Sequence, residues 1–176
     1  MSVLPVRIMG DPVLREKARP VETFDRALKR LVNDMIDTMY DSHGVGLAAP
    51  QVGVSSRIFV FDDGETGPLA MINPELSAFD GEQDGEEGCL SIPGIYFNVK
   101  RAQAVTATAS DVKGKPVELR GEDLLARIFQ HETDHIDGIL FVDRLTEEDR
   151  KLAMRLIREQ ELGLPTSAEA DPSRAL

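Results

Sequence analysis

The feature that most constrains this chain is a pair of histidines, His131 and His135, which stand four positions apart with Glu132 directly after the first. In an α-helix, residues i and i+4 lie on one face, so the two rings would lie one above the other. Two imidazoles at this spacing can hold one metal ion, with Glu132 beside it as a base for a bound water. The alternative interpretation is a pair of histidines buried in a core beside a charged glutamate.

The flanking residues favour the helix that the metal site needs. Glu122 and Asp123 supply negative charge at the expected N-terminus, and Gly138 is a typical residue to end a helix. Apolar residues recur at helical spacing between these limits, at Leu124, Leu125, Ile128, Phe129 and Ile136. The sequence therefore predicts a helix that carries both histidines.

Two histidines do not complete a catalytic metal site, because such sites usually take three protein ligands and keep one position open. The extended pattern H-E-x-x-H-x-x-G-x-x-H continues through Gly138 but ends at Phe141, so the third ligand lies elsewhere. A lone cysteine such as Cys89 is usually a buried thiol, but it can also be a nucleophile or a metal ligand. The incomplete pair of histidines favours the ligand role, and His43 is the competing candidate.

Length and charge limit the class of protein. A chain of 176 residues predicts one domain, which we place at residues 1–164, and the polar residues 165–176 predict a disordered tail. The chain has 31 acidic and 20 basic residues, a net charge of −11 that argues against broad binding to nucleic acid or anionic membranes. The chain has no long apolar run, no secretory signal and a single cysteine, a combination that predicts a cytoplasmic setting.

Periodicity predicts the remaining elements. We expect a helix over residues 23–41, whose apolar stripe, methionines included, is core packing. Strands are expected over residues 57–61, 68–72, 99–109 and 116–120, the last two joined as a hairpin. The acidic residues 80–87 predict a solvated loop, and a capping box that begins at Thr146 predicts a last helix to about Leu162.

Residues 44–51 (GVGLAAPQ) combine two glycines, small residues and a proline, a composition typical of a backbone that passes close to something. One interpretation is a loop that lines a pocket, with the Gln51 amide as a hydrogen-bond donor. The other is a tight connection between a helix and a strand, which this stretch alone slightly favours. The stretch does not match a dinucleotide-binding fingerprint, because the third glycine is missing.

Taken together and in order, GVGLAAPQ, EGCLS and QHETDH resemble the three motifs of the peptide deformylase family. The resemblance runs from near the N-terminus to about residue 160. This family removes the formyl group from the N-terminal methionine of nascent bacterial-type proteins. The resemblance implies an α+β fold, in which antiparallel strands pack around a central helix that bears the histidines.

The resemblance also implies roles for the motif residues. By motif position, Cys89, His131 and His135 would be the metal ligands, and Glu132 would be the catalytic acid/base. The implied native metal is Fe²⁺, with Zn²⁺, Ni²⁺ or Co²⁺ able to occupy the site.

The remaining roles concern the substrate, an N-formylmethionyl nascent peptide. Gln51 and the backbone N–H of Leu90 would hold the formyl oxygen, and Gly46 would help to bind the peptide backbone. The methionine pocket would be lined by Val45, Leu124, Ile128 and His131. Two positions depart from the pattern. Tyr96 stands where some members carry a basic residue, and Arg127, where some members are apolar, is expected to point to solvent with its stem packed.

Two other functions compete with this one. A different metal-dependent amidase or peptidase would take its third ligand from the last helix, at Glu147, Glu159 or Glu161. A non-catalytic module would bind ribosomes through that helix. Its four basic and five acidic residues do not indicate strong attraction to RNA. We therefore expect no specificity for nucleic acid, no membrane binding and only a transient contact with the ribosome.

Overall fold

The computed structural model describes residues 2–164, so the predicted tail at residues 165–176 lies outside the described residues. That residues 1–164 form one domain stays a prediction. The helices are α1 (Arg26–Asp41), α2 (Asp123–Ile136) and α3 (Glu147–Glu161), with short 3₁₀ helices at Pro12–Arg15, Ala49–Val52 and Phe141–Arg144. The strands are β1 (Gly46–Ala48), β2 (Ile58–Phe61), β3 (Leu69–Asp80), β4 (Gln83–Cys89), β5 (Ile92–Arg101), β6 (Ala104–Ser110) and β7 (Pro116–Glu122).

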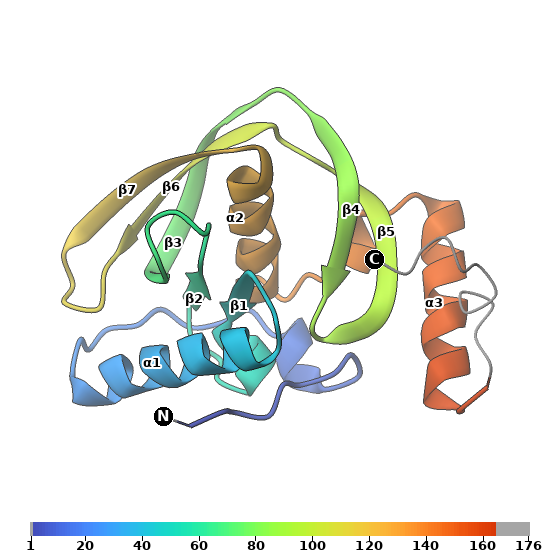
Figure 1. Ribbon diagram of the computed structural model, residues 1–176, viewed down its shortest axis with the longest axis horizontal. Helices are drawn as coiled ribbons and strands as arrows, with labels where there is room; N and C mark the ends of the chain where they lie inside the picture. The colour runs from blue at the N-terminus through green and yellow to red at the C-terminus, as the bar shows by residue number, and fades with distance from the viewer. Residues whose placement is uncertain (1, 165–176) are drawn as a thin grey trace.

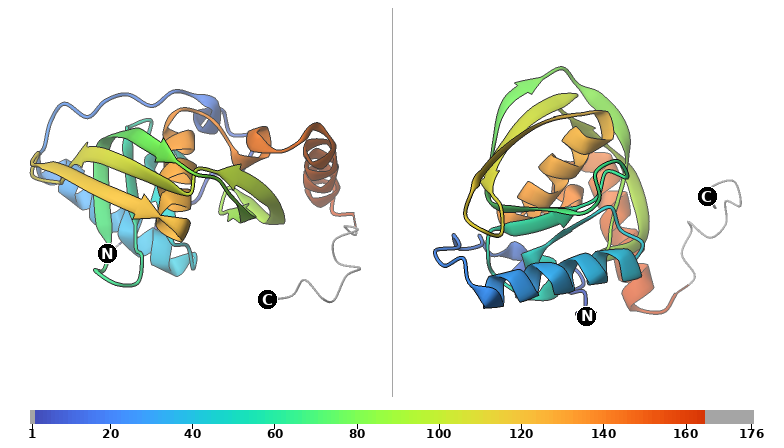
Figure 2. Two further views of the ribbon diagram at one scale, coloured as in Figure 1. Left: turned by 90° about the horizontal axis from the view of Figure 1, so that it is seen from above. Right: turned by 60° about the vertical axis from the view of Figure 1, so that its left-hand side comes forward.

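The strands described between residues 2 and 164 form two antiparallel sheets on either side of α2 (Figure 1). One sheet has five strands in the order β1-β2-β3-β6-β7, and the other is the pair β4-β5. Helix α1 packs on β1 and β2, and α3 lies at the opposite end of the molecule beside β5 (Figure 2). The predicted α+β fold, with antiparallel strands around a central helix, is confirmed.

Helix α2 is fixed by aromatic packing on the five-stranded sheet. The ring of Phe129 meets that of Phe61 edge to face with centroids 5.2 Å apart, and that of Phe59 at 6.1 Å. All three side chains are fully buried, and burial of one such side chain contributes about 1.5–3 kcal/mol. Gly121 on β7 lets the helix approach, because a Cβ there would lie 3.0 Å from the Phe129 ring. This packing turns the histidine face of α2 towards β4.

Helix α1 begins at Arg26, three residues later than the periodicity suggests. The Asp25 side chain accepts a hydrogen bond from Leu28 N at 3.0 Å and caps the helix there. Met35 and Met39 are fully buried in the core below β1 and β2. The prediction that these methionines are core residues is confirmed.

Two predictions are wrong in the middle of the chain. The acidic residues 80–87 are expected to form a solvated loop, but residues 83–87 belong to β4, which pairs with β5 from Gln83↔Arg101 onwards. The expected strand at residues 99–109 is two strands, because the chain passes from one sheet to the other between Arg101 and Ala104. Strand β3 continues to Asp80 and accommodates Pro74 where its register shifts. The β6–β7 hairpin is confirmed.

The last helix begins as its capping box predicts, since Thr146 accepts a hydrogen bond from Asp149 N at 3.2 Å. Its buried residues Ala153, Leu156 and Ile157 join a core cluster with β5. Among the helices of residues 2–164, none has the length and apolar character needed to cross a membrane.

Candidate metal centre

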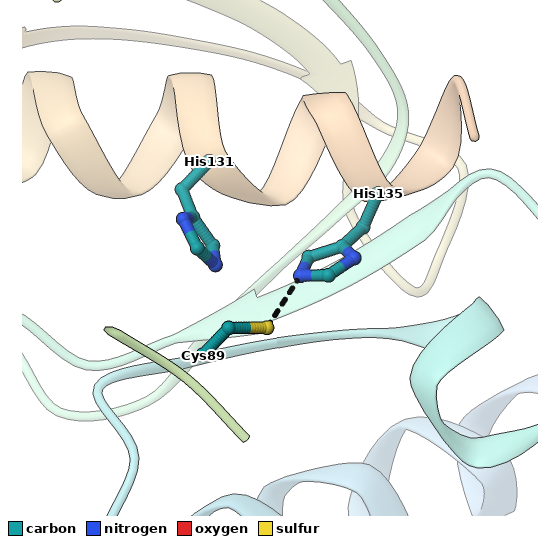
Figure 3. A group of neighbouring side chains, drawn as sticks. All are labelled: Cys89, His131 and His135. Atoms are coloured by element: carbon teal, nitrogen blue, oxygen red, sulfur yellow. Dashed lines mark hydrogen bonds between the residues drawn. The ribbon is translucent and has the colours of Figure 1, made fainter. Parts of the chain in front are cut away.

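Three predicted ligands come together between α2 and the end of β4 (Figure 3). His131 and His135 lie one turn apart on α2, and Cys89 is the last residue of β4. The Cys89 Sγ atom lies 3.1 Å from His135 Nε2, and the ligand atoms of all three residues lie within 4.8 Å of one another. Across the part of the chain that the structure describes, the candidate metal group contains Cys89 and not His43 or a glutamate of α3.

The donor set fits a divalent transition-metal ion. A thiolate and two imidazoles are ligands that such ions prefer, and the group is compact enough for one ion to take all three. Burial opposes the charged thiolate, but the neighbouring His135 and His131 hold the pKa of Cys89 well below its ordinary value. A lowered pKa makes the thiol easier to deprotonate, and the thiolate is the form in which cysteine binds metal.

Glu87 orients one of these rings, and sequence reasoning missed it. Its Oε2 atom lies 2.8 Å from His131 Nδ1, and Arg101 donates to the same carboxylate at 2.8 and 3.0 Å. Burial works against the charged form, but hydrogen bonds with His131 and Arg101 lower the pKa of Glu87 to about 2. Side chains at every second position of a strand share a face, so recognition of β4 would have placed Glu87 on one face with Gln83 and Gly85.

Arg127 also faces the site, and the expectation that it points to solvent is wrong. The residue is only 7% exposed. Its Nη1 donates to Glu87 Oε1 at 2.7 Å and to the carbonyl of Val99 at 2.9 Å, and its Nε donates to Gln83 Oε1 at 3.2 Å. The side chain crosses from α2 to the β4–β5 pair because a buried carboxylate there needs positive charge.

Glu132 lies beside the proposed ligands in a buried position. It is 4% exposed, and its Oε2 atom is buried without a hydrogen-bond partner among the described residues. Burial raises the pKa of Glu132 to about 7, although the two neighbouring histidines act in the opposite direction. The backbone of Gly46 passes so close that a Cβ at that position would overlap Glu132 Oε1. The close approach of this backbone to Glu132 therefore requires glycine at position 46.

The amide of Gln51 is held in one orientation. Its Oε1 accepts from Ala48 N at 2.9 Å, so its Nε2 faces Ser91 Oγ at 3.3 Å and Cys89 Sγ at 3.5 Å. The N–H groups of Gln51 are thus directed towards the ligand cysteine. Leu90 follows Cys89 in the turn between β4 and β5.

A cavity of about 410 Å³ opens onto these groups, a volume typical of small-ligand sites. The predicted residues that line it are Val45, Gly46, Gln51, Cys89, Leu90, Leu124, Ile128, His131 and Glu132, and Tyr96 lines it as well. Val45, Tyr96 and Leu124 are each at least half exposed at its rim. Residues 44–51 therefore contain a short strand and also line a pocket.

A larger hollow of about 760 Å³ lies on the other face of α2. It is lined by charged side chains that already pair, such as Arg57 with Asp137 at 2.7 Å and Arg144 with Asp134 at 2.6 Å. It contains none of the three ligands. The smaller cavity is therefore the one lined by groups that could carry out a reaction.

Comparisons with known proteins agree with this geometry. Residues 3–151 match the family model described as polypeptide deformylase. The peptide deformylase of Acidothermus cellulolyticus is 57% identical over 162 residues, which are 92% of this chain and 89% of that protein. The crystal structure of a peptide deformylase from Legionella pneumophila superposes with a TM-score of 0.86 at 48% identity, covering 92% of this chain and 96% of that one. A Synechococcus elongatus peptide deformylase solved with actinonin gives 0.83 at 38% identity, covering 94% and 90%.

Proposed function

The chain belongs to the polypeptide deformylase family, and from this membership and the site geometry we propose that Cys89, His131 and His135 hold its metal ion. The protein is a metal-dependent hydrolase that removes the formyl group, as formate, from the N-terminal formylmethionine of nascent polypeptides. The observation that carries the assignment of residues is the convergence of Cys89 with both histidines beside the buried Glu132.

An ion held by Cys89, His131 and His135 would supply a water of lowered pKa and positive charge that stabilises a developing oxyanion. Gln51 Nε2 and the backbone N–H of Leu90 donate hydrogen bonds to the formyl oxygen as negative charge develops on it. The fixed orientation of Gln51 supports this role, because a donor that is already aimed needs no reorganisation during the reaction.

Glu132 moves the protons in this proposal. Its carboxylate takes a proton from the attacking water and passes it to the departing amine nitrogen. The position of Glu132 supports the role, because its carboxylate is buried beside the proposed ligands and its Oε2 atom has no hydrogen-bond partner among the described residues that would compete for a proton.

The substrate peptide lies across the cavity mouth. Strand β1 is an edge strand, so Gly46 can offer main-chain groups to an extended peptide on the side away from β2. The methionine side chain enters the cavity between Val45, Leu124, Ile128 and His131. These placements are supported by the lining of the cavity.

We further propose Fe²⁺ as the native ion, with Zn²⁺, Ni²⁺ or Co²⁺ able to replace it. A thiolate ligand makes an iron centre sensitive to oxidation. Iron-loaded protein should therefore lose activity in air much faster than nickel-loaded protein. Equal lifetimes of the two forms under oxygen would contradict iron with a thiolate ligand. We also propose a cytoplasmic setting and a transient contact with the ribosome.

Formate release from formyl-Met-Ala-Ser by anaerobically purified protein tests the function. We expect release by the wild type and a loss of about 100- to 10,000-fold in Glu132→Ala with metal still bound. No release by metal-replete wild type would contradict the deformylase assignment. Full metal content in Cys89→Ala would instead favour a site with another third ligand.

A further inference from the structure

Arg127 and His131 stand four positions apart on α2 and reach the same carboxylate, that of Glu87 on β4. Arg127 Nη1 donates to Glu87 Oε1 at 2.7 Å, and His131 Nδ1 lies 2.8 Å from Glu87 Oε2. The two oxygens of Glu87 therefore bridge the turn of the helix that carries a proposed metal ligand.

Further contacts fix the Arg127 guanidinium against the β4–β5 pair. Its Nη1 also donates to the carbonyl of Val99 at 2.9 Å, and its Nε donates to Gln83 Oε1 at 3.2 Å. Gly85, the partner of Val99 in the register of these strands, leaves room for the guanidinium, because a Cβ there would lie 3.1 Å from Arg127 Nη2. The side chain is thus a buried link between α2 and both strands.

The other arginine at Glu87 divides its charge between two acids. Arg101 donates to both oxygens of Glu87, and its Nη1 donates to Asp134 Oδ2 at 2.6 Å. Among residues 2–164, Arg127 forms an ion pair with Glu87 alone. Loss of the Arg127 charge is therefore felt first at this carboxylate.

A carboxylate orients a ligand histidine only if the carboxylate itself is held in place. Without Arg127, Glu87 Oε1 keeps only the donor from Arg101, so the carboxylate can turn away from His131. The ring then gains freedom, and a freer ring binds an ion less tightly, because its ordering has to accompany binding.

We propose that Arg127 is a positioning residue for the metal centre. It holds Glu87 against His131, and it thereby keeps the Nε2 atom of that ring directed at the ion. Arg127 acts through Glu87 and touches neither the ion nor the substrate. This inference rests on the ligand set given under the proposed function.

A double-mutant cycle on the affinity for Ni²⁺, measured by competition with a chelator of known affinity, tests the inference. Arg127→Leu should weaken binding by about 10-fold, the lower end of the range for groups that orient a ligand histidine. The same change made in Glu87→Gln should alter the affinity by less than about twofold, because the carboxylate through which Arg127 acts is already absent. A merely structural role would lower the affinity equally in both backgrounds.

Arg57→Leu is the matched control. Arg57 also pairs with α2, through Asp137 at 2.7 Å, but it has no contact with Glu87, so this variant should keep the wild-type affinity. Arg127→Lys keeps the buried charge, and its smaller loss of affinity should also disappear in Glu87→Gln. The cycle therefore does not depend on the folding of the leucine variant alone.

The proposal is overturned by equal losses in the two backgrounds, by unchanged affinity in Arg127→Leu, or by an equal loss in Arg57→Leu. Formate release from formyl-Met-Ala-Ser by the nickel-loaded wild type is measured on the same preparations. Failure of the deformylase assignment would appear there, separately from failure of the role of Arg127.

Discussion

Glu87 Oε2 lies 2.8 Å from His131 Nδ1, which leaves Nε2 of that ring free to face an ion. Glu87 stands two residues before Cys89 on the same strand, β4. One strand therefore supplies one proposed ligand and orients another. Carboxylates that hold a ligand histidine in this way fix its tautomer and increase its basicity.

Replacement of Glu87 by Gln should weaken metal binding. The neutral amide keeps the size of the side chain but loses the charge that holds the His131 N–H, so affinity should fall by about 10- to 100-fold. Competition with a chelator of known affinity measures the change. Glu118→Gln, at an exposed position on β7, should leave affinity unchanged. Equal affinity in the Glu87 variant and the wild type would show that ring orientation does not depend on this carboxylate.

Replacement of Gln51 by Leu should reduce kcat while metal stays bound. The variant lacks the donor proposed for the formyl oxygen, and loss of one such donor costs about 100- to 1,000-fold. Single-turnover formate release at matched metal content measures the effect. Ser91→Ala removes only a neighbour of the amide and should cost much less. Similar losses in both variants would point to a disturbed turn instead of a lost donor.

Removal of the ion should lower the melting temperature. The proposed ligands connect β4 with α2, so an ion held by them binds the folded state in preference to the unfolded chain. At a free ion concentration 100 times the Kd, linkage contributes about 2.7 kcal/mol, which corresponds to about 5–10 °C for a chain of this size. Thermal scans with and without a chelator measure the shift. His135→Ala should show none, and an equal shift in that variant would place the ion elsewhere.

The stability of the protein should fall in acid partly through Asp143. Burial works against its charged form, but Arg15 and the N–H of Leu140 outweigh burial and hold the pKa of Asp143 below its ordinary value. A lowered pKa in the folded state contributes stability above the unfolded value, about 4, and this is lost as pH falls through the folded value. Urea unfolding should therefore show Asp143→Asn less stable than wild type at pH 7, with a difference that shrinks below pH 4. A difference independent of pH would contradict the assignment.

The metal helix could be predicted from sequence because its determinants are local. The spacing of His131 and His135, the acidic start and Gly138 all lie within one segment. The same holds for the apolar stripe of α1, which lies within its sixteen residues. Cys89 could be named as a candidate but not chosen from spacing alone, because its approach to the histidines depends on how β4 packs against α2.

The strand β4 and the burial of Arg127 could not be predicted, because each can be recognised only when the other is known. A run with many acidic residues looks solvated until Arg101 and Arg127, far along the chain, neutralise Glu87. An arginine on a helix likewise looks solvent-exposed until the strand that holds its partners is known. Interactions between segments that are distant in the sequence determine the structure of both, and no local sequence pattern reveals such interactions.

The close approach of Gly46 to Glu132 has a consequence for escape from inhibitors. A population selected against a compound in the cavity can change Val45, Tyr96 or Leu124, whose side chains are half exposed at the rim. Every codon change that replaces Gly46 adds a Cβ that pushes on the proposed catalytic carboxylate. For a compound whose affinity comes from the backbone of residue 46, a resistance mutation at that position would therefore also impair the enzyme.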